Sequence, residues 1–182
     1  MKFIKSKTDA WRTVSGEDGA TLSITPAPHL LLSLAQWHGT RSQWPTGMAV
    51  GLTVPNDFSV EDLTDDLPRL SLIALQFPKW TDGRAYSQAH LLRSRMRFTG
   101  DIRATEQVLV DMMLPLQRTG FTSVVLRADQ SRESAERALT FFTSNYQGDV
   151  LEHRPHFGLT PQESAALLSN NPRDFVQIGA SI

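Results

Sequence analysis

From Met48 onward, the hydrophobic and polar positions of the chain follow two alternating patterns. Short, mostly apolar runs typical of buried strands are each followed by a stretch in which apolar residues recur at helical spacing. The strand-like runs are Met48–Val54, Leu70–Phe77, Asp101–Ala104 and Thr122–Leu126. Strands and helices that alternate in this way form parallel sheets with right-handed crossovers. The pattern therefore predicts an α/β fold with four βα units.

The helical spacing is clear in three of the four units. It is carried by Ala85, Ala89, Leu92 and Met96 in the second unit, by Leu109, Met112 and Leu116 in the third, and by Ala135, Ala138, Leu139 and Phe142 in the fourth. The first unit has only a short helix, near Val60 to Leu67. Four units are too few to close an eight-stranded barrel. We therefore expect an open parallel sheet, or a half-barrel-like one.

Two further elements are predicted before this repeat. Strand-like runs at Trp11–Val14 and Thr21–Ile24 flank a turn-rich segment, Ser15–Gly19, which is typical of a β-hairpin. Leu30–Trp37 then has the pattern of a short helix that Gly39 closes. The sequence thus predicts an N-terminal hairpin and a helix packed on the core.

The repeat pattern stops after Tyr146, and a helix start follows at Thr160–Glu163. There threonine is the N-cap, proline occupies the first helical position and glutamate lies three residues after the cap. The helix is expected to end near Leu168. If the remaining tail docks on the body or on another subunit, Phe175 and Ile178 should be mostly buried. If it serves a separate partner, they should be exposed.

These patterns divide the chain into three parts. Residues 1–47 hold the hairpin and the first helix, residues 48–147 the core domain of βα repeats, and residues 148–182 a C-terminal extension. Docking of the tail on another subunit would make the protein a homo-oligomer.

The composition narrows the classes of function. The chain has 182 residues, 40% of them hydrophobic, and a net charge of −1, which argues against a general nucleic-acid binder. It contains no cysteine, which excludes disulfides, a thiol nucleophile, thiolate zinc sites and cysteine-ligated iron–sulfur clusters. No apolar run is long enough to span a bilayer, and no secretory signal is recognisable at the start. We expect a cytoplasmic protein that binds no membrane.

The junction that follows the second predicted strand is the densest candidate site. Open α/β folds bind ligands where the carboxyl ends of strands meet the amino ends of helices. Lys79 and Asp82 are the candidates for acid or base, and Gly83 allows a ligand to approach the backbone closely. Arg84 begins the helix. Tyr86, one turn further, either hydrogen-bonds a ligand or packs its ring on the sheet.

A set of cations is predicted to converge on the same edge of the sheet. Lys79, Arg103 and Arg127 recur every 24 residues at the ends of predicted strands, and Arg84 lies beside the first of them. Together with the amino ends of helices, these side chains suit a small oxyanion or a phosphate-bearing ligand. The alternative is that they form structural ion pairs with nearby acids. The acids close in sequence are Asp82, Glu106 and Asp129.

The sequence predicts neither a metal site nor a cofactor. His153 and His156 are three residues apart, but Pro155 separates them and disfavours a common helical face. The other three histidines lack acidic or histidine partners at ligand spacing. There is no glycine-rich nucleotide motif, no phosphate-loop lysine and no serine in a nucleophile elbow.

The residues of this junction and the units around it resemble a bacterial family, DUF934. The likeness covers roughly residues 30–147 and is carried by Phe77–Ser87, Leu91–Arg93, Gly100–Ala104 and Tyr146-Gln147. The third unit departs from the family, which usually has a Gly-Asp pair where this chain has Thr105–Gln107. Members are labelled as oxidoreductases involved in sulfite reduction, because their genes lie beside those of assimilatory sulfate and sulfite reduction.

The resemblance implies a link to sulfite or sulfate reduction enzymes as partners. Sulfite reduction needs six electrons delivered through a metal cofactor, and this chain has no cluster ligands and no dinucleotide motif. An accessory protein that binds an anion or a reductase is therefore the first expectation. A small α/β enzyme acting on an anionic metabolite and a structural interaction subunit are the alternatives.

Overall fold

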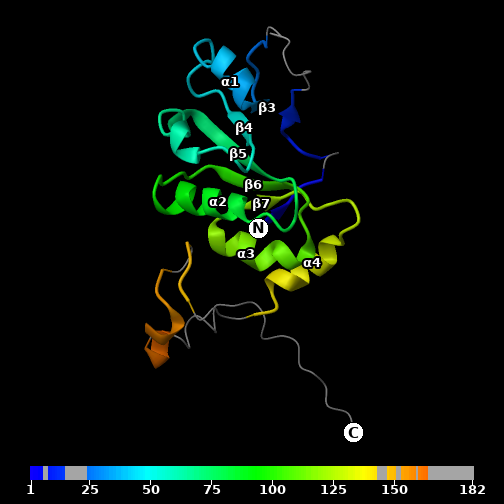
Figure 1. Ribbon diagram of the computed structural model, residues 1–182, viewed down its shortest axis with the longest axis vertical. Helices are drawn as coiled ribbons and strands as arrows, with labels where there is room; N and C mark the ends of the chain where they lie inside the picture. The colour runs from blue at the N-terminus through cyan, green and yellow to red at the C-terminus, as the bar shows by residue number, and fades with distance from the viewer. Residues whose placement is uncertain (6–7, 15–23, 143–146, 151–152, 159, 164–182) are drawn as a thin grey trace.

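The computed structural model describes residues 1–5, 8–14, 24–142, 147–150, 153–158 and 160–163, and all structural statements below concern these residues. They form one seven-stranded parallel sheet that curls as an open half-barrel. Its strands are β1 (Lys2–Phe3), β2 (Arg12–Thr13), β3 (Leu30–Ser33), β4 (Val50–Val54), β5 (Leu70–Phe77), β6 (Asp101–Glu106) and β7 (Ser123–Val124). The order across the sheet is β1-β7-β6-β5-β4-β3-β2 (Figure 1).

The prediction of an open parallel sheet is confirmed. Strands β4 to β7 are consecutive neighbours and every pairing between them is parallel. β5 has the predicted bounds, whereas β6 continues two residues beyond Ala104 and β7 is shorter than predicted. The first strand of the chain lies beside the last, because β1 pairs with β7.

The N-terminal prediction is wrong at one element. Leu30–Ser33 is not helical but forms β3, and the helix α1 (Leu34–Thr40) begins only after it. The three leucines suit a strand that is buried on both faces, so that a run of apolar residues replaces the alternation of an exposed strand. Ser33 caps α1 in a capping box with Gln36.

Within the predicted hairpin, Arg12–Thr13 pair in parallel with Leu30–Leu31. The opposite arm of the hairpin, Thr21–Ser23, lies outside the described residues.

Helices follow the core strands and cover one face of the sheet. They are α2 (Arg84–Ser94), α3 (Met113–Thr119) and α4 (Arg132–Leu139), with short 3₁₀ turns η1 (Val60–Leu63), η2 (Leu67–Arg69), η3 (Val110–Met112) and η4 (His156–Gly158). Ile73, Leu75 and Ile102 point from the strands into the main core, where Ala89 and Leu92 of α2 meet them. After β4, the turns η1 and η2 stand in place of the expected helix.

The opposite face of the sheet, here called the inner face, has a separate small core. Leu31, Leu72 and Ala74 form it, and the ring of Trp11 packs against them. Gly51 leaves room for this ring, since a Cβ atom there would lie 3.0 Å from it. Trp11, directly before β2, therefore covers part of the inner face.

The described part of the C-terminal extension contains the predicted helix start. Thr160 and Glu163 form reciprocal hydrogen bonds, as a capping box requires. Phe175 and Ile178 lie outside the described residues, as does the expected end of this helix. None of the helices in the described part of the chain has the length and hydrophobicity needed to cross a membrane.

Candidate functional site

The candidate site is the carboxyl rim, the edge of the sheet at which the parallel strands end. Two backbone hydrogen bonds join the loops of this edge. The N–H of Gln107 donates to the carbonyl of Phe77 (3.0 Å), and the N–H of Arg127 donates to the carbonyl of Val108 (3.0 Å). The loops that follow β5, β6 and β7 are therefore connected side by side.

At the junction of β5 and α2, Asp82 of the loop and Arg84, the first residue of α2, form a two-point ion pair. Nε of Arg84 donates to Oδ1 of Asp82 (3.0 Å) and Nη2 donates to Oδ2 (2.7 Å). The backbone N–H of Arg84 donates to the same carboxylate (3.2 Å). These hydrogen bonds lower the pKa of Asp82 to about 2. Such a carboxylate is a weak base near neutral pH, which disfavours Asp82 as a general acid or base.

The neighbouring residues of this loop are exposed. Lys79 makes no side-chain hydrogen bond or ion pair with the described residues, and Trp80 is 58% exposed. Around Gly83, a Cβ atom would meet only the ring of Tyr86, at an ordinary 3.7 Å. No contact with the described residues thus requires glycine at this position.

Of the two alternatives predicted for Tyr86, a hydrogen bond to a ligand or a ring packed on the sheet, the structure shows the packed ring. The ring lies edge-on to Phe77 (5.1 Å between ring centres) and to Phe121 (6.4 Å). Burial raises the pKa of its hydroxyl group. Tyr86 therefore anchors α2 on the sheet.

Arg103 does not lie at the rim. Because β6 extends to Glu106, Arg103 is the third residue of the strand rather than its end, and it points to the inner face. Its guanidinium is buried, with ion pairs to Asp9 (2.7 Å) and Asp101 (3.7 Å) and a hydrogen bond to Ser123 (3.3 Å). It forms a structural ion pair, although not with the expected acid.

That acid, Glu106, accepts a hydrogen bond from Nε2 of Gln76 (2.6 Å). Its backbone has a φ of 76°, a left-handed conformation that is uncommon for residues other than glycine. This conformation ends β6 and turns the chain toward Gln107 at the rim.

Arg127 lies at the rim, as predicted. Its Nε and Nη2 donate to the two oxygens of Asp129 (2.6 and 2.7 Å), and its Nη1 donates to Oε1 of Gln107 (3.1 Å). The hydrogen bonds from Arg127 lower the pKa of Asp129 to about 2. The guanidinium is thus held in place by the loops after β6 and β7.

A cavity of about 280 Å³ opens beside Arg127, between the ends of β1 and β7 and the start of α4. Two further cations, Lys5 and Arg132, line it together with Gln130. Arg132 is paired with Glu136 (2.7 Å) and stacks over the ring of Phe3 (5.5 Å). We call this the rim cavity.

Lys5 and Arg132 were not among the predicted site residues. Arg132 directly follows Ser131, the N-cap of α4, so a search of the sequence for helix N-caps at the rim could have found it. Lys5 follows a strand of two residues, which is too short to leave a pattern in the sequence. Of the predicted set, Lys79, Asp82 and Gly83 lie in the loop after β5 and Arg84 begins α2. Arg127 lines the rim cavity, and Arg103 lies within β6.

Fold and site together define a class: a small α/β protein with an open, curled parallel sheet and cations in the loops at its carboxyl rim. A family model described as "Bacterial protein of unknown function (DUF934)" matches residues 51–157, which is more than half of the chain. The chain therefore belongs to this family. A search of curated proteins found no match. The described residues contain no group of three or more metal-ligating side chains placed to hold a metal ion.

Proposed function

We propose that this chain is a cytoplasmic accessory protein of assimilatory sulfite reduction that binds a small oxyanion in the rim cavity. The reductase or a related enzyme of sulfate assimilation is its proposed partner. The two parts of the proposal rest on different grounds, and they are tested separately.

Anion binding is supported by one observation, the convergence of Lys5, Arg127 and Arg132 on a single cavity. The two arginines are each offset by one carboxylate, whereas the ammonium of Lys5 has no ion-pair partner among the described residues. The site thus carries an excess of positive charge. Guanidinium and ammonium groups form short, charge-assisted hydrogen bonds with oxyanions, and the cavity is close to the small end of the range for ligand pockets.

The link to sulfur comes from the resemblance to proteins labelled for sulfite reduction. A chain without cysteine has no thiolates for an iron–sulfur cluster, so electron transfer is assigned to the partner. Sulfite and sulfate are the anions to test first, with phosphate as a comparison.

The test is thermal unfolding of the full chain with millimolar sulfite, sulfate or phosphate, against chloride at equal ionic strength. A ligand that binds only the folded state raises the melting temperature by mass action. We expect a rise that Arg127→Gln and Lys5→Gln each abolish. Arg137→Gln is the matched control, since Arg137 is also on α4 and paired at i,i+4 with an acid, but does not line the cavity. An equal rise in Arg127→Gln and in the unmodified protein would contradict the proposed site.

The partner is tested independently by titrating the full chain into purified assimilatory sulfite reductase and measuring complex mass by light scattering. We expect a stoichiometric complex. If none forms with or without sulfite, the reductase is not the partner, and the anion site is then tested by thermal unfolding alone.

A further inference from the structure

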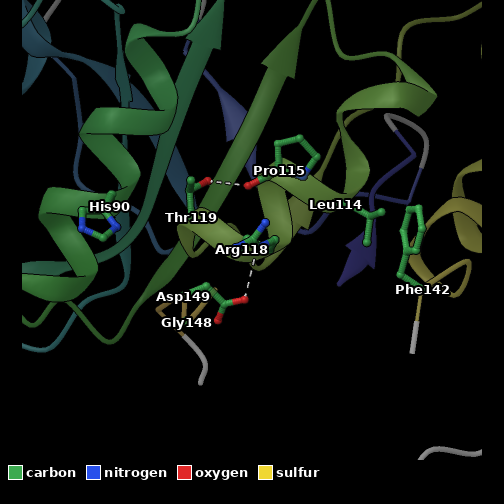
Figure 2. A pocket seen from close by; sticks show the side chains of 8 residues that line it. All are labelled: His90, Leu114, Pro115, Arg118, Thr119, Phe142, Gly148 and Asp149. Carbon is green, nitrogen blue, oxygen red and sulfur yellow. Dashed lines mark hydrogen bonds and ion pairs between the residues drawn. The ribbon is translucent and has the colours of Figure 1, made fainter. Parts of the chain in front are cut away.

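A second cavity lies on the outer side of the helices. It has a volume of about 460 Å³ and lies between α2, α3 and the segment 147–150 (Figure 2). Arg118 and Thr119, in the last turn of α3, line it. Because α3 leads into the start of β7, this end of the helix lies toward the amino end of the sheet, away from the carboxyl rim. The cavity is therefore separate from the rim cavity.

Its two sides differ chemically. Leu114, Pro115 and Phe142 supply apolar surface, while Arg118, Asp149 and His90 supply polar groups. Figure 2 shows Phe142 and Leu114 together at one end and Arg118 above Asp149 nearer the other. Pockets that combine an apolar wall with a few polar groups are the usual form of sites for organic ligands.

Arg118 is poorly satisfied by the described protein groups. Its Nε lies 3.4 Å from Oδ2 of Asp149 but is buried without a hydrogen-bond partner. Its Nη2 donates to the carbonyl of Gln147 at 3.3 Å. Charge-assisted pairs of a guanidinium normally close to about 2.7–2.9 Å. A ligand oxyanion about 2.7–2.9 Å from the guanidinium would be a better acceptor for Arg118 than Asp149 or the carbonyl of Gln147.

We infer that this cavity binds an aromatic organic anion, with its carboxylate or sulfonate on Arg118 and its ring against Leu114, Pro115 and Phe142. Neither the charged group nor the ring alone is expected to bind as tightly as the whole ligand. The charged group gains a specific partner at Arg118, and the ring removes apolar surface from water. Asp149 repels the anion and competes for Arg118, so it weakens binding.

The experiment titrates the full chain with naphthalene-2-sulfonate and follows backbone amide chemical shifts by NMR. Sulfate supplies the charge without the ring, and 2-naphthol supplies the ring without the charge. We expect shifts around Arg118 and Thr119 with the sulfonate, and affinities measured from these same amides that are lower by roughly tenfold or more for each half-ligand.

Variants assign the contacts. Arg118→Gln should lower the affinity for naphthalene-2-sulfonate by roughly tenfold, and Asp149→Asn should raise it a few-fold. Phe142→Ser, at a position that is 57% exposed, should weaken binding of the sulfonate while leaving the shifts that sulfate causes at Arg118 unchanged. Arg95→Gln is the control and should bind normally, because Arg95 follows α2 and pairs with Glu61 outside the cavity.

The inference is overturned if Arg118→Gln and Phe142→Ser bind the sulfonate as the parent does, or if the shifts map elsewhere. Arg127→Gln should leave this binding unchanged. A loss in that variant would mean that the probe occupies the rim cavity, which also overturns the inference.

Discussion

Arg103 and Arg127 lie 24 residues apart in successive βα units, yet they occupy opposite environments. The side chain of Arg103 is only 4% exposed and is fixed on the inner face by Asp9 and Asp101. The side chain of Arg127 is 36% exposed and lines a cavity at the rim. The same residue type at the same interval serves the fold in one case and, as we propose, a ligand in the other.

The difference arises from register. β6 runs three residues past Arg103, whereas β7 ends three residues before Arg127. A position inside a strand points to one face of the sheet, and a position after the strand points into the rim loops. An even interval in the sequence therefore predicts where strands and helices recur, but it does not predict which way the side chain at each interval points.

The largest effect is expected for Arg103→Gln. Removing a buried cation leaves two carboxylates without their charge partner, and such losses destabilise by about 3 kcal/mol. The free energy of unfolding from urea denaturation measures this. Arg127→Gln is the matched control and should unfold close to the unmodified protein. Equal losses in the two variants would remove the distinction between them.

A second prediction concerns Asp129, which competes with a ligand for Arg127. Asp129→Asn removes the opposing charge beside the rim cavity and should tighten the binding of sulfate or sulfite several-fold. Isothermal titration calorimetry measures the dissociation constant. Weaker binding in Asp129→Asn would mean that the carboxylate orients Arg127 for the ligand instead of competing with it.

The third prediction concerns acid stability. Arg84 and Arg127 lower the pKa values of Asp82 and Asp129 to about 2, below the usual value of 3.8. Groups with depressed folded-state pKa values contribute stability that is complete above the unfolded pKa and lost as the pH falls toward 2. The melting temperature should therefore fall less between pH 4 and pH 2 in a double Asp→Asn variant at these two positions. An identical acid profile would show that these exposed pairs add nothing measurable.

The smallest effect is expected for Arg84→Gln. Its ion pair with Asp82 is exposed, and exposed pairs contribute little. Neither the melting temperature nor its rise with sulfate should change resolvably. If Arg84→Gln abolishes the rise while Arg127→Gln does not, the anion site belongs to the loop after β5 and not to the rim cavity.

The core of the fold was predictable because its signals are local. The apolar run of β5 and the helical spacing of Ala85, Ala89 and Leu92 are each read within one segment, and both are confirmed. β3 was missed because three consecutive leucines fit either a buried strand or a short helix. Only its pairing with β4, which lies outside the local window, decides between them.

The site was predictable only in part, for the same physical reason. Arg127 follows a strand and could be placed at the rim. The contact of Arg103 with Asp9 joins residues 94 positions apart, and no local sequence pattern around either residue predicts it. Lys5 reaches the rim cavity only because β1 pairs with β7, a contact between the two ends of the sheet.

The most direct test of the proposed anion site is a crystal structure of the full chain grown in selenate, with anomalous scattering to locate the anion. We predict a selenium peak in the rim cavity, within hydrogen-bond reach of Lys5 and of Arg127 or Arg132. An empty rim cavity, or a peak confined to Lys79 and Arg84 in the loop after β5, would contradict it.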